Sequence, residues 1–253
     1  MELILKKYQG QPAGLLAQVR RGSVEDLAAF CALQDEVRAS MPDPELFMPD
    51  TEEELRGMLQ NDLCLGVWLG ERLVAFFILR YCGENEHNYA RVLGVPASDW
   101  RYWANADSVA VHPDVRGNGL QQRLLRLAEQ WRDPAIVGIG GTISPQNPYS
   151  LKNAQACGFT ITKRCSMYGG HDRYVLQKQL MPLPGQYRHF KGGRYQLLEL
   201  AQHSETRQPM VVYRALYGER GLWVRPAEMW FEHVERDGYS GPRFVWEKAD
   251  ASV

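Results

Sequence analysis

The chain has 253 residues, of which 45% are apolar and 23% charged, and its formal net charge is −1. This composition predicts packed globular structure, either one large domain or an ordinary domain with a small one, rather than disorder. A net charge so close to zero provides no general attraction for nucleic acid or anionic lipid, so neither is an expected partner.

The number of cysteines is five, and no CxxC pair occurs. An odd number without paired spacing is typical of reduced thiols in a cytoplasmic protein, rather than of a disulfide framework or a zinc site. Residues 1–10 do not form a secretory signal, and the longest apolar run, 73–79, is too short to cross a bilayer. We therefore expect a soluble cytoplasmic protein without a membrane partner.

The first half of the chain alternates helical and extended patterns. Ser23 with Asp26, and Thr51 with Glu54, resemble capping boxes that each precede a helical apolar stripe. Two extended runs separated by Gly70-Glu71 then predict a hairpin, and a long polar and aromatic insertion follows. After it, strands are expected at 108–111, 136–142, 159–163 and 173–178, and helices at 119–131 and 147–157.

A segment with two prolines and a glycine, 181–186, predicts a linker. Beyond it the pattern is short and β-rich, with strands expected at 195–202, 210–216, 222–225 and 244–247. The predicted organisation is an α/β domain over residues 1–180 and a small antiparallel, barrel-like β module over residues 186–250.

The most informative stretch runs from Asp107 to Leu125, where a predicted strand enters a glycine-containing turn that opens an amphipathic helix. Backbone N–H groups at such a turn, together with the partial positive charge of the helix N-terminus, can cradle a diphosphate. Gly117 and Gly119 allow the backbone to approach a ligand closely. The alternative is a strand-to-helix loop that binds nothing. Neither a P-loop ending nor a three-glycine dinucleotide fingerprint is present.

This stretch resembles the coenzyme-A-binding motif of the GNAT acyltransferases, Arg/Gln-x-x-Gly-x-Gly/Ala. Arg116 and Gly119 match the first two anchors, whereas Gln121 stands where Gly or Ala is expected. The run 109–113 is similar to the family's splayed central strand, and 147–151 with 157–159 is similar to its late helix and Gly-Phe strand start. The resemblance covers roughly residues 18–180 and implies a GNAT-like mixed central sheet with flanking helices.

The resemblance implies an N-acetyltransferase that moves an acetyl or short acyl group from acetyl-CoA to an amine of a small molecule, peptide or protein, without a metal. Unpaired backbone groups of the splayed strand would bind the pantetheine amides and hold the thioester. The residues implied in coenzyme binding are Val109, Val111, Arg116, Gly117, Asn118, Gly119, Leu120, Gln121, Asn147 and Asn153. Asn147 has a second interpretation, because it can cap its helix without contacting a ligand.

The general acid and base follow less directly. Ala154 stands where many relatives carry an acidic tyrosine, so Tyr149 and Tyr168 are the nearest substitutes, each with a packing or substrate-wall role as the alternative. Asp107 matches a frequent carboxylate position, and its alternative is a solvated strand end. The insertion 82–103 fits a substrate lid or an ordinary anchored loop.

Residues 186–249 resemble a small bacterial module known only as a domain of unknown function. The tyrosines and tryptophans at 195, 213, 223 and 230 could form a binding face or a core, and the His203–Glu205 segment fits a hydrogen-bonded turn better than a catalytic triad. Two other functions remain open: a non-catalytic acyl-CoA sensor, and a peptide or RNA recruiter with an accessory transferase domain. A homodimer is also left open.

Overall fold

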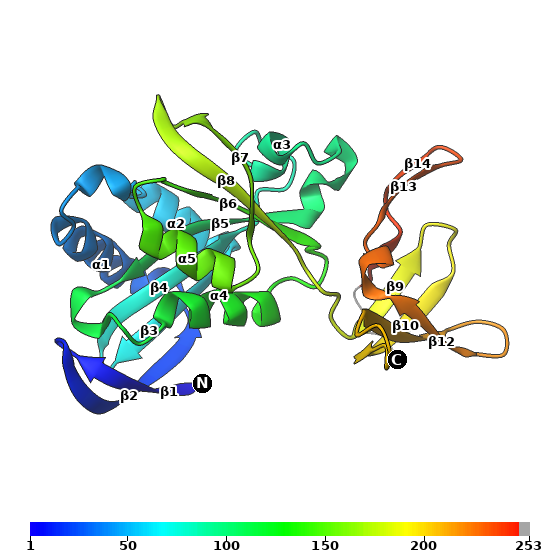
Figure 1. Ribbon diagram of the computed structural model, residues 1–253, viewed down its shortest axis with the longest axis horizontal. Helices are drawn as coiled ribbons and strands as arrows, with labels where there is room; N and C mark the ends of the chain where they lie inside the picture. The colour runs from blue at the N-terminus through cyan, green and yellow to red at the C-terminus, as the bar shows by residue number, and fades with distance from the viewer. Residues whose placement is uncertain (248–253) are drawn as a thin grey trace.

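The computed structural model describes residues 1–247, which form a large sheet, a short linker, and a C-terminal part with a five-stranded and a two-stranded sheet (Figure 1). The large sheet has eight strands in the order β1-β2-β3-β4-β5-β6-β8-β7. Its strands are β1 Glu2–Tyr8, β2 Gln11–Arg21, β3 Leu63–Leu69, β4 Arg72–Arg80, β5 Trp103–Val111, β6 Gly138–Ile143, β7 Thr160–Met167 and β8 His171–Gln179. The β5–β6 pair is parallel and the other neighbouring pairs are antiparallel, so this is the mixed sheet that was expected.

Helices cover both faces of the large sheet. They are α1 Leu27–Ala39, α2 Glu52–Asn61, α3 Tyr89–Leu93, α4 Leu120–Trp131 and α5 Pro148–Ala156. Successive residues of β4 point to opposite faces of the sheet. Phe77 packs in the apolar cluster that includes α4 and α5, whereas Phe76 packs in the cluster that includes α1 and α2. This alternation explains why β4 is buried almost throughout, since a strand covered on both faces needs apolar side chains on each.

The second sheet is antiparallel, with the order β12-β11-β10-β9-β15, and a two-stranded ribbon β13–β14 accompanies it. Its elements are β9 Gly185–His189, β10 Arg194–Gln202, β11 Pro209–Ala215, β12 Leu222–Pro226, β13 His233–Arg236, β14 Tyr239–Pro242 and β15 Phe244–Trp246. The predicted α/β class with an added β module is confirmed, although the strand order within residues 1–247 leaves two edges rather than closing a barrel. Residues 248–250 of the predicted module lie outside the described part of the chain.

Two parts of the large domain differ from the predicted elements: strands β1 and β2 were not expected, and the insertion is structured. Residues 82–102 contain α3 and a 3-10 segment, η3 Ala97–Tyr102, and β5 begins at Trp103 rather than at Ser108. Polar residues in the first half of β5 concealed the strand, because Asn105 is buried there and its side chain binds backbone atoms of the insertion. The early strand start places the whole insertion against β5 and β6.

The glycine-rich sequence of β6 makes room for that packing. A Cβ atom at Gly138 would lie 2.6 Å from the Trp103 ring, and one at Gly140 would lie 2.8 Å from Cβ of Tyr89. Both distances are too short for real contacts, so these two positions require glycine where the insertion crosses the strand.

All five cysteines are free thiols. None of the helices formed by residues 1–247 combines the length and apolar character that a membrane crossing requires. Within the same residues, no three His, Cys, Asp or Glu side chains form a group that could hold a metal ion.

Candidate active site

The central feature of the site is the separation of β5 from β6. The two strands pair from Trp103–Gly138 to Ala106–Gly141, and the pairing ends there. Beyond this point β5 continues to Val111 with β4 as its partner. The second half of β5 therefore has an edge that β6 does not cover, as the splayed strand of the sequence prediction requires.

A β-bulge lies at the same point. Phe77 pairs with Val109 and Leu79 with Ala106, so Asp107 and Ser108 together oppose the single residue Ile78. Bulges of this kind turn side chains away from the regular alternation and are frequent next to active sites. Here the bulge brings Asp107, Ser108 and Val109 to the wall of one cavity.

The cavity has a volume of about 610 Å³. Its walls come from the segment before α2, the bulged strand β5, the start of α5, the insertion and the β7–β8 turn. The polar residues that line it are Asp50, Glu54, Arg80, Glu86, His87, Asn88, Tyr89, Asp107, Ser108, Thr142, Ser144, Asn147, Ser150, Tyr168 and Arg173. This volume is in the range of small-molecule sites, and the lining offers both acidic and hydroxyl groups.

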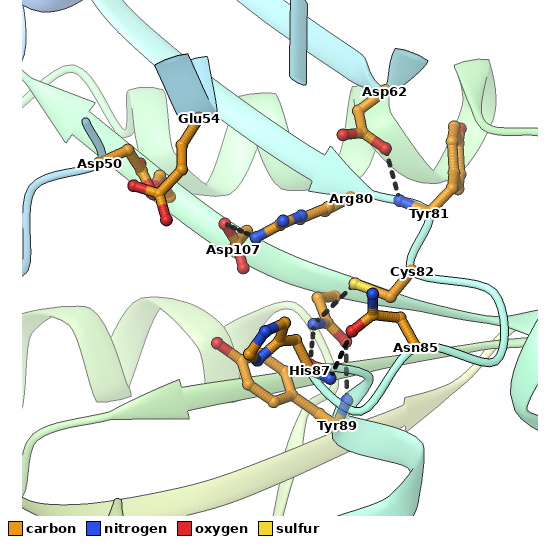
Figure 2. A network of polar contacts seen from close by, with 12 residues as sticks. Asp50, Glu54, Asp62, Arg80, Tyr81, Cys82, Asn85, His87, Tyr89 and Asp107 are labelled. Carbon is orange, nitrogen blue, oxygen red and sulfur yellow. Dashed lines mark hydrogen bonds and ion pairs between the residues drawn. The ribbon is translucent and has the colours of Figure 1, made fainter. Parts of the chain in front are cut away.

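Asp107 is the most perturbed carboxyl group of the cavity. Its side chain is 12% exposed, and burial, together with the nearby negative charge of Asp50, raises its pKa from 3.8 to about 7. Arg80 opposes this shift, but its Nη1 lies 3.8 Å from Oδ2 of Asp107, too far for a short charged hydrogen bond (Figure 2). Burial therefore outweighs the ion pair, and the carboxyl titrates near neutral pH, where a general base is most effective.

Asp50 faces the same space as Asp107 and Glu54 in Figure 2. The buried Gln34 side chain fixes its backbone by donating to the Asp50 carbonyl at 2.7 Å and accepting from the Asp50 amide at 3.2 Å. The Ser108 hydroxyl donates to Oδ2 of Asp50 at 2.6 Å, yet burial still raises the pKa of this carboxyl. Sequence reasoning missed Asp50, although its place directly before the Thr51–Glu54 capping box was a usable signal.

Tyr168 reaches the cavity from the turn between β7 and β8. It has a φ of 51°, in the left-handed region that side-chain-bearing residues seldom adopt, and two glycines follow it. Its hydroxyl lies 2.6 Å from that of Tyr89 and 2.9 Å from Oγ1 of Thr142. Burial raises the pKa of Tyr168 above 10, so the phenol keeps its proton at neutral pH. A protonated, hydrogen-bonded phenol in a cavity wall can act as a proton donor.

Two positions on α5, Tyr149 and Ala154, also bear on the predicted proton donor. Tyr149 is 83% exposed and does not line the cavity, so its position gives no support to an acid role. Ala154, at the position where relatives carry a tyrosine, is buried at 6% exposure. Asp107 and Tyr168 are thus the predicted catalytic residues that the structure brings together in one cavity.

The glycine turn lies at the C-terminal end of β5. Gly117 and Gly119 have φ values of 84° and 66°, and α4 begins at the next residue, Leu120. A Cβ at Gly119 would meet no atom within 4 Å, so the turn is open on that side. Leu120 itself is buried and anchors the helix, and Arg116 donates to the Ser40 hydroxyl at 3.1 Å. Positive φ values directly before the start of a helix are features that backbone anion cradles share.

Gln121, the departure from the motif, is held away from the turn. Its side chain donates to the Ser150 hydroxyl at 3.0 Å and accepts from the Asn153 amide at 2.8 Å. Asn153 also accepts from Gln122 at 2.9 Å. These bonds join α4 to α5, so the larger residue is accommodated without filling the cradle, and Asn153 has its amide engaged in the same contact.

The remaining predicted coenzyme residues fall into different environments. Asn147 lines the cavity and also caps α5, since its Oδ1 accepts from the Ser150 amide at 3.0 Å. Asn118 accepts from the amides of Lys6 and Lys7 and donates to two carbonyls, so it fastens β1 to the turn. Val109 lines the cavity, whereas Val111 pairs with Ala75 outside it.

The mixed sheet with a splayed strand, the bulge at the splay and the glycine turn entering a helix are the features expected of a GNAT-like fold. Comparison with protein families agrees: the acetyltransferase (GNAT) family matches residues 30–159, and a family described as a protein of unknown function, DUF1653, matches residues 185–246. The chain belongs to the GNAT acetyltransferase family and carries a DUF1653 domain at its C-terminal side.

Three solved structures are similar to one part or the other of this chain. A GNAT-family acetyltransferase from Streptococcus pneumoniae is 18% identical, with a TM-score of 0.50, over 65% of this chain and 99% of the other. A GNAT phosphinothricin acetyltransferase from Sinorhizobium meliloti, in complex with acetyl-CoA, is 17% identical, with a TM-score of 0.48, over 65% and 88%. A DUF1653 protein from Bordetella bronchiseptica is 36% identical, with a TM-score of 0.26, over 28% and 94%. A search of curated proteins gave no match.

Proposed function

We propose that this protein is an N-acetyltransferase that transfers an acetyl group, or another short acyl group, from acetyl-CoA to an amine. In this proposal residues 1–180 form the catalytic domain and residues 186–250 the added domain. The observation that carries it is the meeting of Asp107 and Tyr168 in one cavity at the point where β5 leaves β6.

The residues present fit acetyl-CoA. Backbone N–H groups of the turn, where Gly117 and Gly119 have positive φ values, and of the start of α4 would hold the diphosphate. The uncovered edge of β5 around Val109 would hold the pantetheine amides. Asn147 would lie near the thioester end, since it lines the cavity. When bound, acetyl-CoA supplies an activated thioester carbonyl.

The chain's own side chains would handle the protons. A carbon–nitrogen bond forms, a carbon–sulfur bond breaks, and one proton moves overall from the amine to the thiol. Asp107, with its pKa near 7, would accept the proton from the amine directly or through one water. Tyr168 would donate a proton to the departing sulfur and be reprotonated from solvent, since its raised pKa keeps it neutral before the reaction.

The acidic side of the cavity favours an amine that arrives with positive charge. Four carboxyl groups line the space, at positions 50, 54, 86 and 107, against two arginines, Arg80 and Arg173, and one histidine. Opposite charge would attract the ammonium form to the cavity, where it would first release one proton to solvent; Asp107 would then accept the second proton as the carbon–nitrogen bond forms.

A sensor that binds acyl-CoA without turnover is the second candidate, because Ala154 removes the family's usual acid. One experiment separates the two. Purified full-length protein is melted with acetyl-CoA or CoA, and a panel of polyamines, amino acids and lysine-containing peptides is assayed for acetylated product by mass spectrometry. A ligand at about 100 times its Kd adds about 2.7 kcal/mol of stability. A shift with product supports the transferase, a shift without any product favours the sensor, and the absence of both contradicts the proposal.

A further inference from the structure

Residues 82–102 lie between the cavity and the C-terminal sheet. In Figure 1 this segment, around α3, is on the side of the large sheet that faces β13 and β14. One side of the segment forms a wall of the cavity, through His87, Asn88, Tyr89 and Val92. The other side packs into an apolar cluster with the C-terminal domain, through Ala90, Leu93, Val95, Trp100 and Tyr102. We therefore expect a displacement of this segment at the contact between the domains to displace the cavity wall as well.

The packing between the two domains resembles a protein core. Ala90, Trp103 and Val137 of the GNAT domain are at most 7% exposed, and they belong to one cluster with Tyr187 and Trp230, which are fully buried. The other buried members from the C-terminal domain are Leu197, Val211, Tyr213, Ala227, Phe231 and Phe244. Because aromatic side chains bury large areas and pack in preferred orientations, such a cluster fixes the insertion more firmly than a wet surface contact would.

Polar contacts fix the register of this packing. Oδ2 of Asp99, in η3, lies 2.8 Å from Nδ1 of His233, in β13, and the Asp99 side chain is only 7% exposed. The hydroxyl groups of Ser98 and Ser240 lie 3.1 Å apart beside this pair. A buried carboxylate requires partners, and here the Ser98 hydroxyl donates to Oδ1 at 3.3 Å while the shorter contact, to Oδ2, comes from the other domain.

Hydrogen bonds carry this position to the cavity wall. The side-chain amide of Asn88 donates to the backbone carbonyls of Trp100 at 2.9 Å and Trp103 at 3.2 Å. These bonds connect the η3 end of the insertion to the start of α3. The next residue, Tyr89, holds the Tyr168 hydroxyl at 2.6 Å. A continuous set of contacts thus connects β13 of the C-terminal domain with the proposed proton donor.

We propose that the C-terminal domain is a positioning element of the acetyltransferase site, and that the Asp99–His233 pair holds the insertion so that Asn88 and Tyr89 form the acceptor wall. Asp99 and His233 are positioning residues, since neither of them lines the cavity. The inference rests on the proposed function in one respect: the wall serves an acceptor only if the cavity binds one.

The test uses full-length protein and two readouts. His233→Ala removes the interdomain partner, and His203→Ala, in the exposed β10–β11 turn, is the matched control. We expect hydrogen exchange of the 83–103 amides to accelerate roughly tenfold in His233→Ala, because a hydrogen bond to a charged group contributes enough for that factor. The control should exchange like the wild type. Asp99→Asn, which keeps the size of the side chain, repeats the test if His233→Ala does not fold.

The second readout is kinetic and uses the acceptor found in the amine panel. In His233→Ala we expect the KM for the acceptor to rise several-fold while the KM for acetyl-CoA stays within about twofold, since the glycine turn is remote from the interdomain contact. Unchanged exchange in 83–103 overturns the proposal, and so does accelerated exchange with an unchanged acceptor KM. If the wild type binds no acetyl-CoA, the proposed function fails, and the exchange result still decides whether the C-terminal domain holds the insertion.

Discussion

Because of the Asp107 carboxyl, we expect the free energy of unfolding to decrease as pH rises. We expect the rate of acetyl transfer to increase over the upper part of the same pH range. In the unfolded chain this group titrates at 3.8, and in the folded protein at about 7. Between these values the folded protein keeps a proton that the unfolded chain has released, so the free energy of unfolding decreases as pH rises through this window. The difference corresponds to roughly 4 kcal/mol as an upper limit, and the full penalty is present above pH 7.

Asp107→Asn removes this titration. At pH 8 the variant should unfold at a Tm several degrees above that of the wild type, because about 1 kcal/mol shifts the Tm of a chain of this size by roughly 2–4 °C. Near pH 4 the two proteins should differ little. Activity should change in the opposite direction: kcat falls by about 10²–10⁴ and loses the rise through pH 7 that the wild type shows.

The assay pairs calorimetry at pH 4, 6 and 8 with acetyl transfer to an acceptor whose own amine titrates well away from pH 7. Asp62→Asn is the control, because burial also raises the pKa of Asp62, but its carboxylate accepts the Tyr81 amide outside the cavity lining. The control should keep its activity. A stability difference between Asp107→Asn and wild type that does not grow with pH would refute the burial argument, and full activity in Asp107→Asn would refute the role as a base.

Three other substitutions test separate parts of the site. Tyr168→Phe should lower kcat by about tenfold or more with little change in the KM for acetyl-CoA, which steady-state kinetics would show; equal kcat would contradict the donor role. Lys7→Ala should weaken CoA binding several-fold by calorimetry, since the Lys7 side chain lies against Gly117 of the cradle, whereas Lys6→Ala is the matched control. Gly140→Ala should displace Tyr89 and destabilise the protein by about 1–3 kcal/mol in urea unfolding; an unchanged midpoint would show that the insertion adapts freely.

Local sequence signals were sufficient for elements whose chemistry is local. The capping box of Thr51 and Glu54 forms as expected, with the Glu54 amide bonded to the Thr51 hydroxyl at 3.2 Å. The His203 segment is the hydrogen-bonded turn that its composition indicated, since Nδ1 accepts from the amides of Glu205 and Thr206. The glycine turn before α4 was also predictable, because glycines mark turns, and both Gly117 and Gly119 do adopt positive φ values.

The rest of the site depended on contacts between distant segments. Nothing in the sequence near Asp50 shows that Gln34 and Ser108 will hold it beside Asp107. The polar Asn105 interrupted the apolar pattern of β5, although its burial is compensated by bonds to the insertion. Strands β9, β13 and β14 were not expected either, since short strands on a small sheet carry little periodicity.

The insertion 82–102 is packed on two sides, against the large sheet and against the C-terminal domain. A long loop beside an active site ordinarily moves, because few apolar contacts oppose its conformational entropy. Here Gly138 and Gly140 of β6 leave room for the side chains of Trp103 and Tyr89, and the C-terminal domain covers the opposite side with Tyr187 and Trp230. Neither contact alone would bury the segment on both sides. If the cavity binds an acceptor as proposed above, its wall is as ordered as the contact between the domains, and the C-terminal domain then acts on catalysis through that contact.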